Sequence, residues 1–174
     1  MNAGKTTLMI QARHNYLEMG MKALVFVPSI AISDSGEAVS RTGLSVPADS
    51  IGDEDGISRD FSGVDVIFVD EAQFLTRDQV DNLACIVDRD DIPVIAYGLR
   101  TDFMGNLFEG SSRLLALADV ISEVKTVCHC GKKATMTLRV CDDGTSVKDG
   151  TQIMIGGNES YRSVCRRHYM EEMW

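Results

Sequence analysis

The chain has 174 residues, with 17 lysines and arginines against 26 aspartates and glutamates, and a formal net charge of −9. A chain of this length can bury roughly two-thirds of its unfolded surface in one domain, or in one domain with a small appendage. Its hydrophobic fraction of 44% and charged fraction of 25% are ordinary globular values, which exclude wholesale disorder and a fibrous protein.

The charge balance and the hydropathy pattern also exclude some partners. A large nucleic-acid-binding surface needs clustered lysine and arginine, which the acidic balance disfavours. The sequence has no run of about 18 apolar residues and does not open on a basic region followed by an apolar run. We therefore expect a cytoplasmic protein that binds neither membrane nor nucleic acid.

The first sixty residues predict one helix and one strand. Residues 5–19 are expected to be helical, because Leu8, Ala12 and Tyr16 recur at four-residue intervals and Met9 and Leu17 widen this stripe. Gly20 supplies a left-handed stop. Residues 23–27 form an unbroken apolar run, typical of a strand covered on both faces. Residues 29–62 are rich in Ser, Gly and Asp and predict mostly loop with short pieces of structure.

Further strands and helices follow in alternation. Residues 64–69 and 93–98 are predicted strands. Between them a helix should begin at Thr76, whose side chain can form a capping box with Gln79 while Leu75 packs on Val80. The remaining elements up to residue 127 are a helix over 113–118 and a fourth strand over 120–127. Such alternation implies an α/β fold with parallel strands and crossover helices.

The pattern changes near residue 126. Residues 135–140 and 151–155 predict short strands between glycine-containing turns, and residues 166–173 predict a terminal helix. We therefore expect an α/β domain over residues 1–126 and a smaller domain over residues 127–174.

The tripeptide Gly4-Lys5-Thr6 matches the second half of a phosphate-binding loop. Backbone amides at a helix start face an anion, the Lys5 ammonium can hold the β- and γ-phosphates, and the Thr6 hydroxyl can ligate Mg²⁺. The alternative is an ordinary helix N-terminus, since the leading glycine of the motif would lie before residue 1.

An acidic pair, Asp70 and Glu71, follows the predicted strand over 64–69. Phosphate-binding α/β folds place their ligands at the carboxyl ends of such strands. There Asp70 could bind Mg²⁺ and Glu71 could accept a proton from the attacking nucleophile. The alternative is a solvated pair that starts a turn.

Four of the cysteine and histidine residues form a candidate zinc site. Cys128 and Cys130 make one close pair, and Cys165 and His168 make a second. Thiolates and imidazole are ligands that Zn²⁺ prefers, and two pairs on separate turns can close a tetrahedron. Four filled positions predict a structural site. Free thiols are the alternative, and His129 could compete as a ligand.

Taken together, these segments resemble the thymidine kinases of the tetrameric, zinc-containing type. The matching segments are NAGKTT, VDEAQFL, YGLRTDF with Phe108 beyond it, CHCGKKA and IGGNESYRSVCRRHY. The resemblance extends over nearly the whole chain. It implies a P-loop NTPase-like parallel sheet flanked by helices over residues 1–126, a zinc-binding lasso domain over residues 127–174, and a homotetramer.

The resemblance also implies an activity. The enzyme would transfer the ATP γ-phosphate to the 5′-hydroxyl of thymidine, and of deoxyuridine, in pyrimidine salvage, with Glu71 as general base. ATP and Mg²⁺ would be bound by Met1, Asn2, Ala3, Gly4, Lys5, Thr6, Asp70 and Gln73.

For the nucleoside, the resemblance implies a pocket and a lasso loop rooted by zinc. Pocket and lasso would comprise Phe74, Leu99, Phe103, Phe108, Met154, Ile155, Gly156, Gly157, Asn158 and Tyr161. The zinc ligands would be Cys128, Cys130, Cys165 and His168. Core packing is the alternative for Leu99 and the phenylalanines, and a plain turn for the two glycines.

Two features depart from the family pattern. The family has a β-strand before its phosphate loop, whereas this sequence opens at Met1. The family also places an acidic residue and an arginine, one residue apart, soon after the second strand. Here residues 29–33 carry no charge, and the first acidic residue and the first arginine that follow are Asp34 and Arg41. These departures raise a rival hypothesis, an impaired or truncated homologue that binds nucleotides without turnover. A second rival, suggested by the cysteines, is a zinc-ribbon nucleic-acid binder, which the net charge disfavours.

Overall fold

The computed structural model describes residues 3–52, 57, 60–154 and 160–174. The chain divides into two compact units. The sheet unit consists of Gly4–Gly98 and Glu109–Ile121, and the cysteine unit contains Leu99–Phe108 and Ser122–Trp174. The cysteine unit thus includes residues 127–174, expected as the smaller domain, together with the earlier segment Leu99–Phe108.

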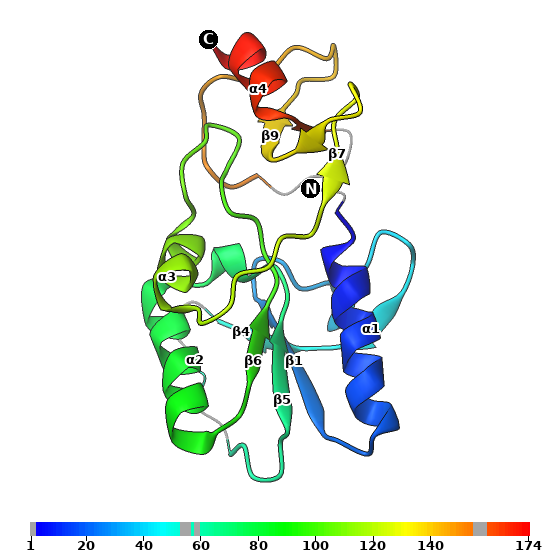
Figure 1. The fold of residues 1–174 in the computed structure, drawn as a ribbon, viewed down its shortest axis with the longest axis vertical. Coiled ribbons are helices and arrows are strands. Elements are labelled where there is room, and N and C mark those ends of the chain that lie inside the picture. The colour runs from blue at the N-terminus through cyan, green and yellow to red at the C-terminus, as the bar shows by residue number, and fades with distance from the viewer. Residues whose placement is uncertain (1–2, 53–56, 58–59, 155–159) are drawn as a thin grey trace. The chain divides into compact units, whose positions relative to one another are not determined.

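Four parallel strands form the centre of the sheet unit, in the order β4-β1-β5-β6 (Figure 1). Their bounds are Ala23–Pro28 for β1, Asp49–Ile51 for β4, Val66–Val69 for β5 and Val94–Ala96 for β6. The α/β prediction is confirmed, as are the strands expected near residues 23–27, 64–69 and 93–98.

The two central strands of this sheet, β1 and β5, are covered on both faces. Helix α1 (Lys5–Glu18) covers one face, and α2 (Arg77–Asp90) with α3 (Glu109–Leu117) covers the other (Figure 1). On β5, Val66 and Phe68 pack toward α1, while Ile67 and Val69 pack toward α2. Because alternate side chains leave a strand on opposite faces, both sets must be apolar, which explains the unbroken apolar runs.

Of the stripe predicted on α1, Met9, Ala12 and Tyr16 are confirmed, whereas Leu8 and Leu17 are exposed. Met9 is fully buried, whereas Leu8 is 47% exposed. Met9, Ala12 and Tyr16 pack against the sheet, and the Tyr16 ring meets Phe68 edge-on at a centroid distance of 5.8 Å. Leu8 falls at the edge of this stripe, because 3.6 residues complete a turn. The left-handed stop at Gly20 is confirmed, with φ of 76°.

Helix α2 begins as predicted. The Gln79 amide donates to Thr76 Oγ1 at 3.2 Å, and the Thr76 amide donates to Gln79 Oε1 at 2.9 Å. Leu75 and Val80 are both buried in the core beneath α2, as expected of a hydrophobic staple. The capping box therefore fixes the start of the helix.

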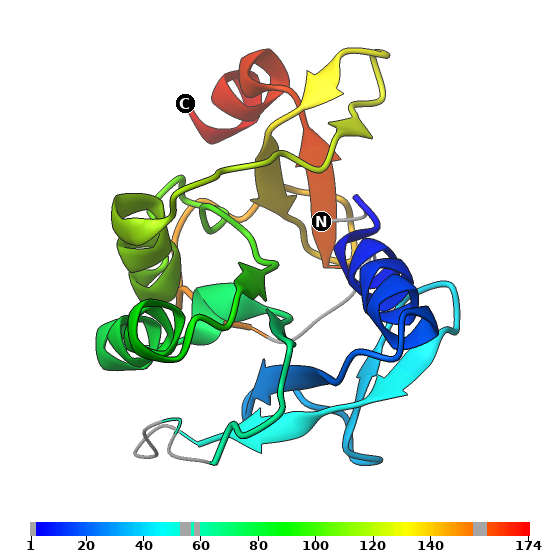
Figure 2. The ribbon, with the colours of Figure 1, turned by 60° about the horizontal axis from the view of Figure 1, so that its bottom comes forward.

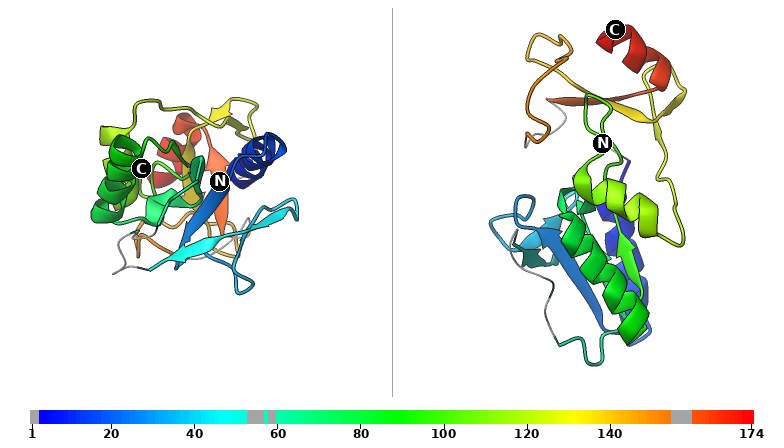
Figure 3. Two further views of the ribbon diagram at one scale, coloured as in Figure 1. Left: turned by 90° about the horizontal axis from the view of Figure 1, so that it is seen from below. Right: turned by 90° about the vertical axis from the view of Figure 1, so that its left-hand side faces the viewer.

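Helix α3 starts earlier than the predicted residue 113. It begins at Glu109, whose carboxylate accepts a hydrogen bond of 2.8 Å from the Arg77 amide. α3 lies beside α2 (Figure 3). Arg113 Nε contacts Asp81 Oδ1 at 2.5 Å. Its first turn contains Gly110 and serines, whose low helix propensity concealed the start from sequence reasoning.

The long segment 29–62 contains three short strands. β2 (Glu37–Val39) and β3 (Ser45–Pro47) form an antiparallel hairpin on the α1 side (Figure 2). Ala38 and Val46 of this hairpin join the core around Met9. β4 extends the main sheet by pairing with β1. Each strand has three residues, which is too short for a hydrophobic alternation to be visible.

The cysteine unit contains two small antiparallel sheets and a helix. β9 (Met136–Arg139) pairs with β10 (Tyr161–Val164), and β7 (Thr126–Val127) pairs with β8 (Lys133–Ala134). Helix α4 spans Arg166–Met173. The strand expected over 135–140 and the helix expected over 166–173 are confirmed.

Two strand predictions are wrong. Over residues 120–127 only Thr126 and Val127 form a strand, and Val120 is 81% exposed. Among the described residues, the apolar side chains around Val120 have no neighbouring strand or core to pack against, so an extended conformation buries little of their surface. Residues 151–154 are not a strand either, because β9 pairs with β10 instead, while Ile155 lies outside the described residues. In the part of the chain that the structure describes, no helix is both long and apolar enough to cross a membrane.

Candidate nucleotide site and metal centre

The start of α1 meets the carboxyl end of β5. The Thr6 hydroxyl donates a hydrogen bond of 2.6 Å to Asp70 Oδ2, across 64 positions of sequence. Asp70 follows β5 directly, and its amide bonds to the Phe26 carbonyl at 3.0 Å, which continues the ladder to β1. The sheet thereby brings the predicted phosphate-loop hydroxyl and the predicted magnesium carboxylate together.

Asp70 is a buried acid, with 3% of its surface exposed. Burial raises the pKa of its carboxyl group, and the neighbouring Glu71 carboxylate raises it further. The Thr6 hydroxyl, the Glu71 amide and the Lys5 ammonium each lower this pKa without reversing the net rise. A carboxylate held at such a cost is stabilised when a cation binds it, which suits a Mg²⁺ site.

The N-terminus of α1 is suited to an anion. Gly4 occupies the cap position with φ of 75°, a left-handed conformation that favours glycine. No side chain caps the helix, and its first turn has no acidic residue. Lys5 and Ala3 are half-buried, while Met1 and Asn2 lie outside the described residues. The amides and the positive end of the helix dipole are thus available for phosphate.

Glu71 has a strained backbone. Its φ of 49° and ψ of 35° place a non-glycine residue in the left-handed region, which costs about 1–2 kcal/mol. The Ala72 amide donates to the Tyr97 carbonyl at 2.9 Å and so fixes the turn. The buried Gln73 side chain donates to Glu71 Oε2 at 2.5 Å. Strain of this kind is typical of functional sites.

Two glycines that sequence reasoning missed allow this turn, η1 (Ala72–Phe74), to pack closely. A Cβ atom on Gly110 would lie 2.6 Å from the Ala72 carbonyl oxygen and 2.7 Å from that of Leu75. A Cβ atom on Gly98 would lie 2.9 Å from Gln73 Oε1. The sequence signals this packing only through the positions of the two glycines: Gly98 follows a predicted strand, and Gly110 lies just before a predicted helix.

The expected pocket residues are divided between the units. Phe74 is half-buried in η1 of the sheet unit. In the cysteine unit, Phe103 and Phe108 are buried, Leu99 is half-buried and Met154 is 42% exposed. The last four expected lasso residues before Tyr161 lie outside the described residues: Ile155, Gly156, Gly157 and Asn158.

Hydrogen bonds anchor the Leu99–Phe108 segment within the cysteine unit. The Tyr169 hydroxyl of α4 donates to the Phe103 carbonyl at 2.9 Å. Gln152 Nε2 donates to Asp102 Oδ2 at 2.8 Å. Sequence reasoning gave no role to Tyr169, Asp102 or Gln152, because these contacts join residues about 50 or more positions apart.

The four predicted metal ligands converge. One donor atom from each of Cys128, Cys130, Cys165 and His168 lies within 4.8 Å of all the others. Cys128 Sγ is 3.3 Å from His168 Nδ1, Cys165 Sγ is 3.5 Å from that nitrogen, and Cys130 Sγ is 3.9 Å from Cys165 Sγ. These separations approach the roughly 3.6–3.8 Å edges of a tetrahedron with Zn–S bonds of about 2.3 Å.

The chemistry of this cluster favours a thiolate-bound metal. Burial raises the pKa of the Cys128 thiol, but hydrogen bonds from the Cys130 amide, from His168 and from the Cys165 amide outweigh it and lower the pKa to about 5. His168 presents Nδ1 to the sulfurs, and its Nε2 lies 3.8 Å from Glu171 Oε2. A carboxylate behind a ligating histidine orients the ring and raises its basicity. His129 stacks on His168 at 4.2 Å and stays outside the four-ligand set.

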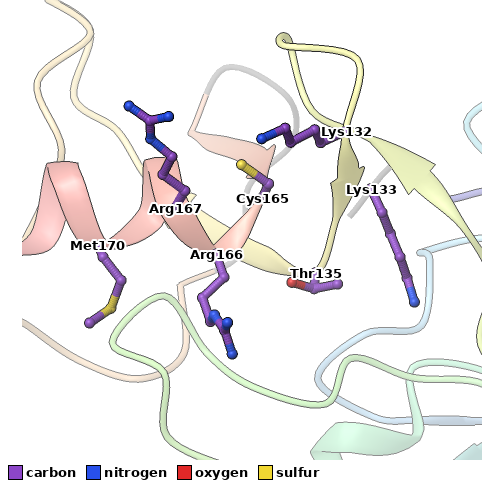
Figure 4. A pocket seen from close by; sticks show the side chains of 7 residues that line it. All are labelled: Lys132, Lys133, Thr135, Cys165, Arg166, Arg167 and Met170. Atoms are coloured by element: carbon purple, nitrogen blue, oxygen red, sulfur yellow. The ribbon is translucent and has the colours of Figure 1, made fainter.

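A hollow of about 580 Å³ opens on the Cys165 side of this cluster (Figure 4). With Zn²⁺, three thiolates and one neutral imidazole carry about one net negative charge. Four cationic side chains line the hollow: Lys132, Lys133, Arg166 and Arg167. Lys133 pairs with Glu123 and Arg167 with Glu171, which leaves Lys132 and Arg166 as the cations best placed to offset the charge of the cluster.

The parallel sheet, the phosphate-loop helix start and the strand-end Asp70 define an α/β protein of the P-loop type, with an added Cys₃His module that can hold a metal. The thymidine kinase family model matches residues 1–169. The chain belongs to the thymidine kinase family, and the resemblance found in its motifs is confirmed.

Individual relatives of the chain are thymidine kinases as well. A thymidine kinase of Enterobacteria phage T4 is 52% identical over 178 residues, covering 98% of this chain and 92% of the relative. A thymidine kinase of Rhodopirellula baltica is 49% identical over 181 residues, covering 100% and 86%. One of Shewanella oneidensis is 46% identical over 181 residues, covering 100% and 94%.

Proposed function

We propose that this protein is an ATP-dependent thymidine kinase, which transfers the γ-phosphate of ATP to the 5′-hydroxyl of thymidine and of deoxyuridine. The observation that carries the proposal is the 2.6 Å hydrogen bond between Thr6 and Asp70. It joins a hydroxyl at a phosphate-binding helix start to a buried strand-end carboxylate, the pair that holds Mg²⁺ in P-loop enzymes.

In this proposal the N-terminal segment binds ATP. The phosphates lie against residues 1–6, where the α1 amides and the Lys5 ammonium neutralise them. Thr6 and Asp70 hold Mg²⁺, which supplies positive charge to the phosphoryl oxygens. Gln73 lines the same site through its contact with Glu71.

Glu71 is the proposed general base. Gln73 occupies Oε2, so Oε1 is available to accept the proton of the nucleoside 5′-hydroxyl. As that proton moves to Glu71, the 5′-oxygen forms a bond to the γ-phosphorus. The bond between this phosphorus and the bridging oxygen breaks, and ADP leaves with the electron pair.

The nucleoside would be held by an apolar pocket and by the lasso. A thymine ring needs a flat apolar slot with a few fixed polar groups. We assign the slot to Phe74, Leu99, Phe103 and Phe108, and the polar contacts to the lasso residues Met154, Ile155, Gly156, Gly157, Asn158 and Tyr161. A structural zinc on the Cys₃His cluster would limit the freedom of the lasso at its root.

We add three further assignments, of which the homotetramer alone comes from the family resemblance. They are a division into domains at residues 126 and 127, a homotetramer and a cytoplasmic location. Sedimentation of the purified protein tests the tetramer directly: a monomer at micromolar concentration would contradict it.

The decisive experiment measures ATP-dependent, Mg²⁺-dependent phosphorylation of thymidine by the purified chain. Glu71→Gln should lose turnover by at least about a hundredfold while ATP still binds. Glu18→Gln, a carboxylate exposed on α1, is the matched control and should remain active. Full activity of Glu71→Gln would remove Glu71 as the base. Nucleotide binding by the unaltered chain without turnover would instead indicate an impaired homologue.

A further inference from the structure

Arg139 is a buried cation to which the proposed mechanism gives no role. It is the last residue of β9, and only 5% of its surface is exposed. It forms no ion pair with any residue that the structure describes, and its Nε atom has no hydrogen-bond partner there. Because burying a guanidinium without a carboxylate is costly, its remaining contacts must hold it in place.

Those contacts are two aromatic rings and two oxygen atoms. The guanidinium carbon lies 4.0 Å from the centre of the Phe103 ring and 5.5 Å from that of Tyr161. Nη2 donates to the Tyr161 hydroxyl at 3.0 Å and to the Gln152 carbonyl at 3.3 Å. β-sheet register places Arg139 directly opposite Tyr161. A planar cation suits this geometry, since it can stack and donate at once.

The contacts continue into the segments on both sides. Having accepted from Arg139, the Tyr161 hydroxyl donates to the Met154 carbonyl at 2.7 Å. Gln152, whose carbonyl Arg139 binds, donates through its side chain to Asp102, next to Phe103. One side chain therefore connects residues 152–154, Tyr161 and the Phe103 segment, all within the cysteine unit.

We propose that Arg139 is a positioning residue for the nucleoside. It fixes the face of Phe103 and holds the two described arms of the lasso, residues 152–154 and 160–161, in place before the nucleoside binds. This inference rests on the proposed function, in which Phe103 and Tyr161 contact the nucleoside. ATP binding should not depend on Arg139, because most of the proposed ATP-site residues belong to the sheet unit: Gly4, Lys5, Thr6, Asp70 and Gln73.

Kinetics of Arg139→Met and Arg139→Lys test the assignment. The KM for thymidine should rise about tenfold in Arg139→Met and less in Arg139→Lys, because lysine keeps a donor but cannot stack as a plane. The KM for ATP should stay within about twofold, and the zinc content should not change. Arg162→Met, on the neighbouring strand with its side chain 44% exposed, is the control and should match the unaltered chain. An unchanged thymidine KM, or an equal rise in both KM values, overturns the proposal.

Hydrogen exchange separates this inference from the proposed function. Without ligand, amides of residues 150–154 and 160–163 should exchange faster in Arg139→Met than in Arg162→Met, while those of β5 should be unchanged. Equal exchange in the lasso arms overturns the positioning role even if the protein is an active kinase. Faster exchange together with no thymidine phosphorylation by the unaltered chain would show that Arg139 holds the lasso arms, while refuting the proposed function and with it the role toward the nucleoside.

Discussion

The Gln73 side chain donates a hydrogen bond of 2.5 Å to the carboxylate of Glu71, whose own backbone is left-handed. Gln73 is buried and packed close to Gly98, so it is a rigid support. The amide of Ala72, the residue that follows Glu71, donates a hydrogen bond to the Tyr97 carbonyl and is fixed by it. The proposed base is therefore held in a strained conformation by neighbours that cannot easily move.

Relieving that strain should raise stability at the expense of activity. Glu71→Gly removes the left-handed penalty but also the acceptor of the buried Gln73 side chain, so it should increase the free energy of unfolding by at most about 1 kcal/mol, measured by urea denaturation. The same change should abolish thymidine phosphorylation. Asp91→Gly is the matched control, because Asp91 at the end of α2 also has a positive φ, of 55°. It should stabilise similarly and stay active. A loss of stability in Glu71→Gly that exceeds the cost of the lost Gln73 hydrogen bond, about 1–3 kcal/mol, would show that the turn is not strained.

The raised pKa of Asp70 makes its charge a cost to folding. The unfolded carboxyl ionises near its usual value of 3.8, whereas the folded one ionises at higher pH, so the folded state binds more protons in between. Asp70 therefore lowers stability progressively as pH rises through that window, and the cost persists above it. Asp70→Asn should unfold at a higher temperature than the unaltered chain at about pH 8, with a smaller difference at about pH 5.

Magnesium adds a second readout for the same variant. MgATP should raise the unfolding temperature of the unaltered chain, because the cation favours the charged form of Asp70. Asp70→Asn should lose most of this increase. Asp65→Asn, at the opposite end of the same strand, should keep it. An equal MgATP response in both variants would place the metal elsewhere.

Part of this site was predictable from the sequence because its signals are local. Lys5 and Thr6 lie in one tripeptide, Asp70 ends an apolar run, and the four metal ligands form two close pairs. Arg139 gave no such signal, since its partners Phe103, Gln152 and Tyr161 are brought to it only by strand pairing and loop contacts.

The secondary structure likewise was predictable where the sequence signal is local and was missed where it depends on tertiary contacts. The unbroken runs in β1 and β5 are visible because both faces are buried, and the capping box of α2 is contiguous. By contrast, β4 contributes one buried residue, Ile51, to the core, too little for a pattern. The apolar run around Val120 imitates a strand, although its side chains stay exposed. Burial is decided by tertiary context that a short window does not contain.

Close packing of α3 on η1 makes Gly110 sensitive to the smallest side chain. A Cβ atom there would lie 2.6 Å from a backbone oxygen, which cannot rotate away as a side chain could. Gly110→Ala should cost about 1–3 kcal/mol of unfolding free energy and reduce kcat by shifting the turn after Glu71. Ser112→Ala, exposed on the same helix, should change neither value. Unchanged stability of Gly110→Ala would mean that α3 moves freely against the turn.

The metal centre should contain about one zinc per chain, measured by elemental analysis of protein purified under reducing conditions. Cys128→Ser should lose most of it, because a serine hydroxyl stays protonated at neutral pH and is a poor zinc ligand. Cys85→Ser should retain it, since Cys85 on α2 lies in the other unit. Chelation of the unaltered protein should loosen the lasso root and raise the thymidine KM before it affects the KM for ATP. Equal zinc in both variants would contradict the site, because a metal bound elsewhere would not distinguish these two cysteines.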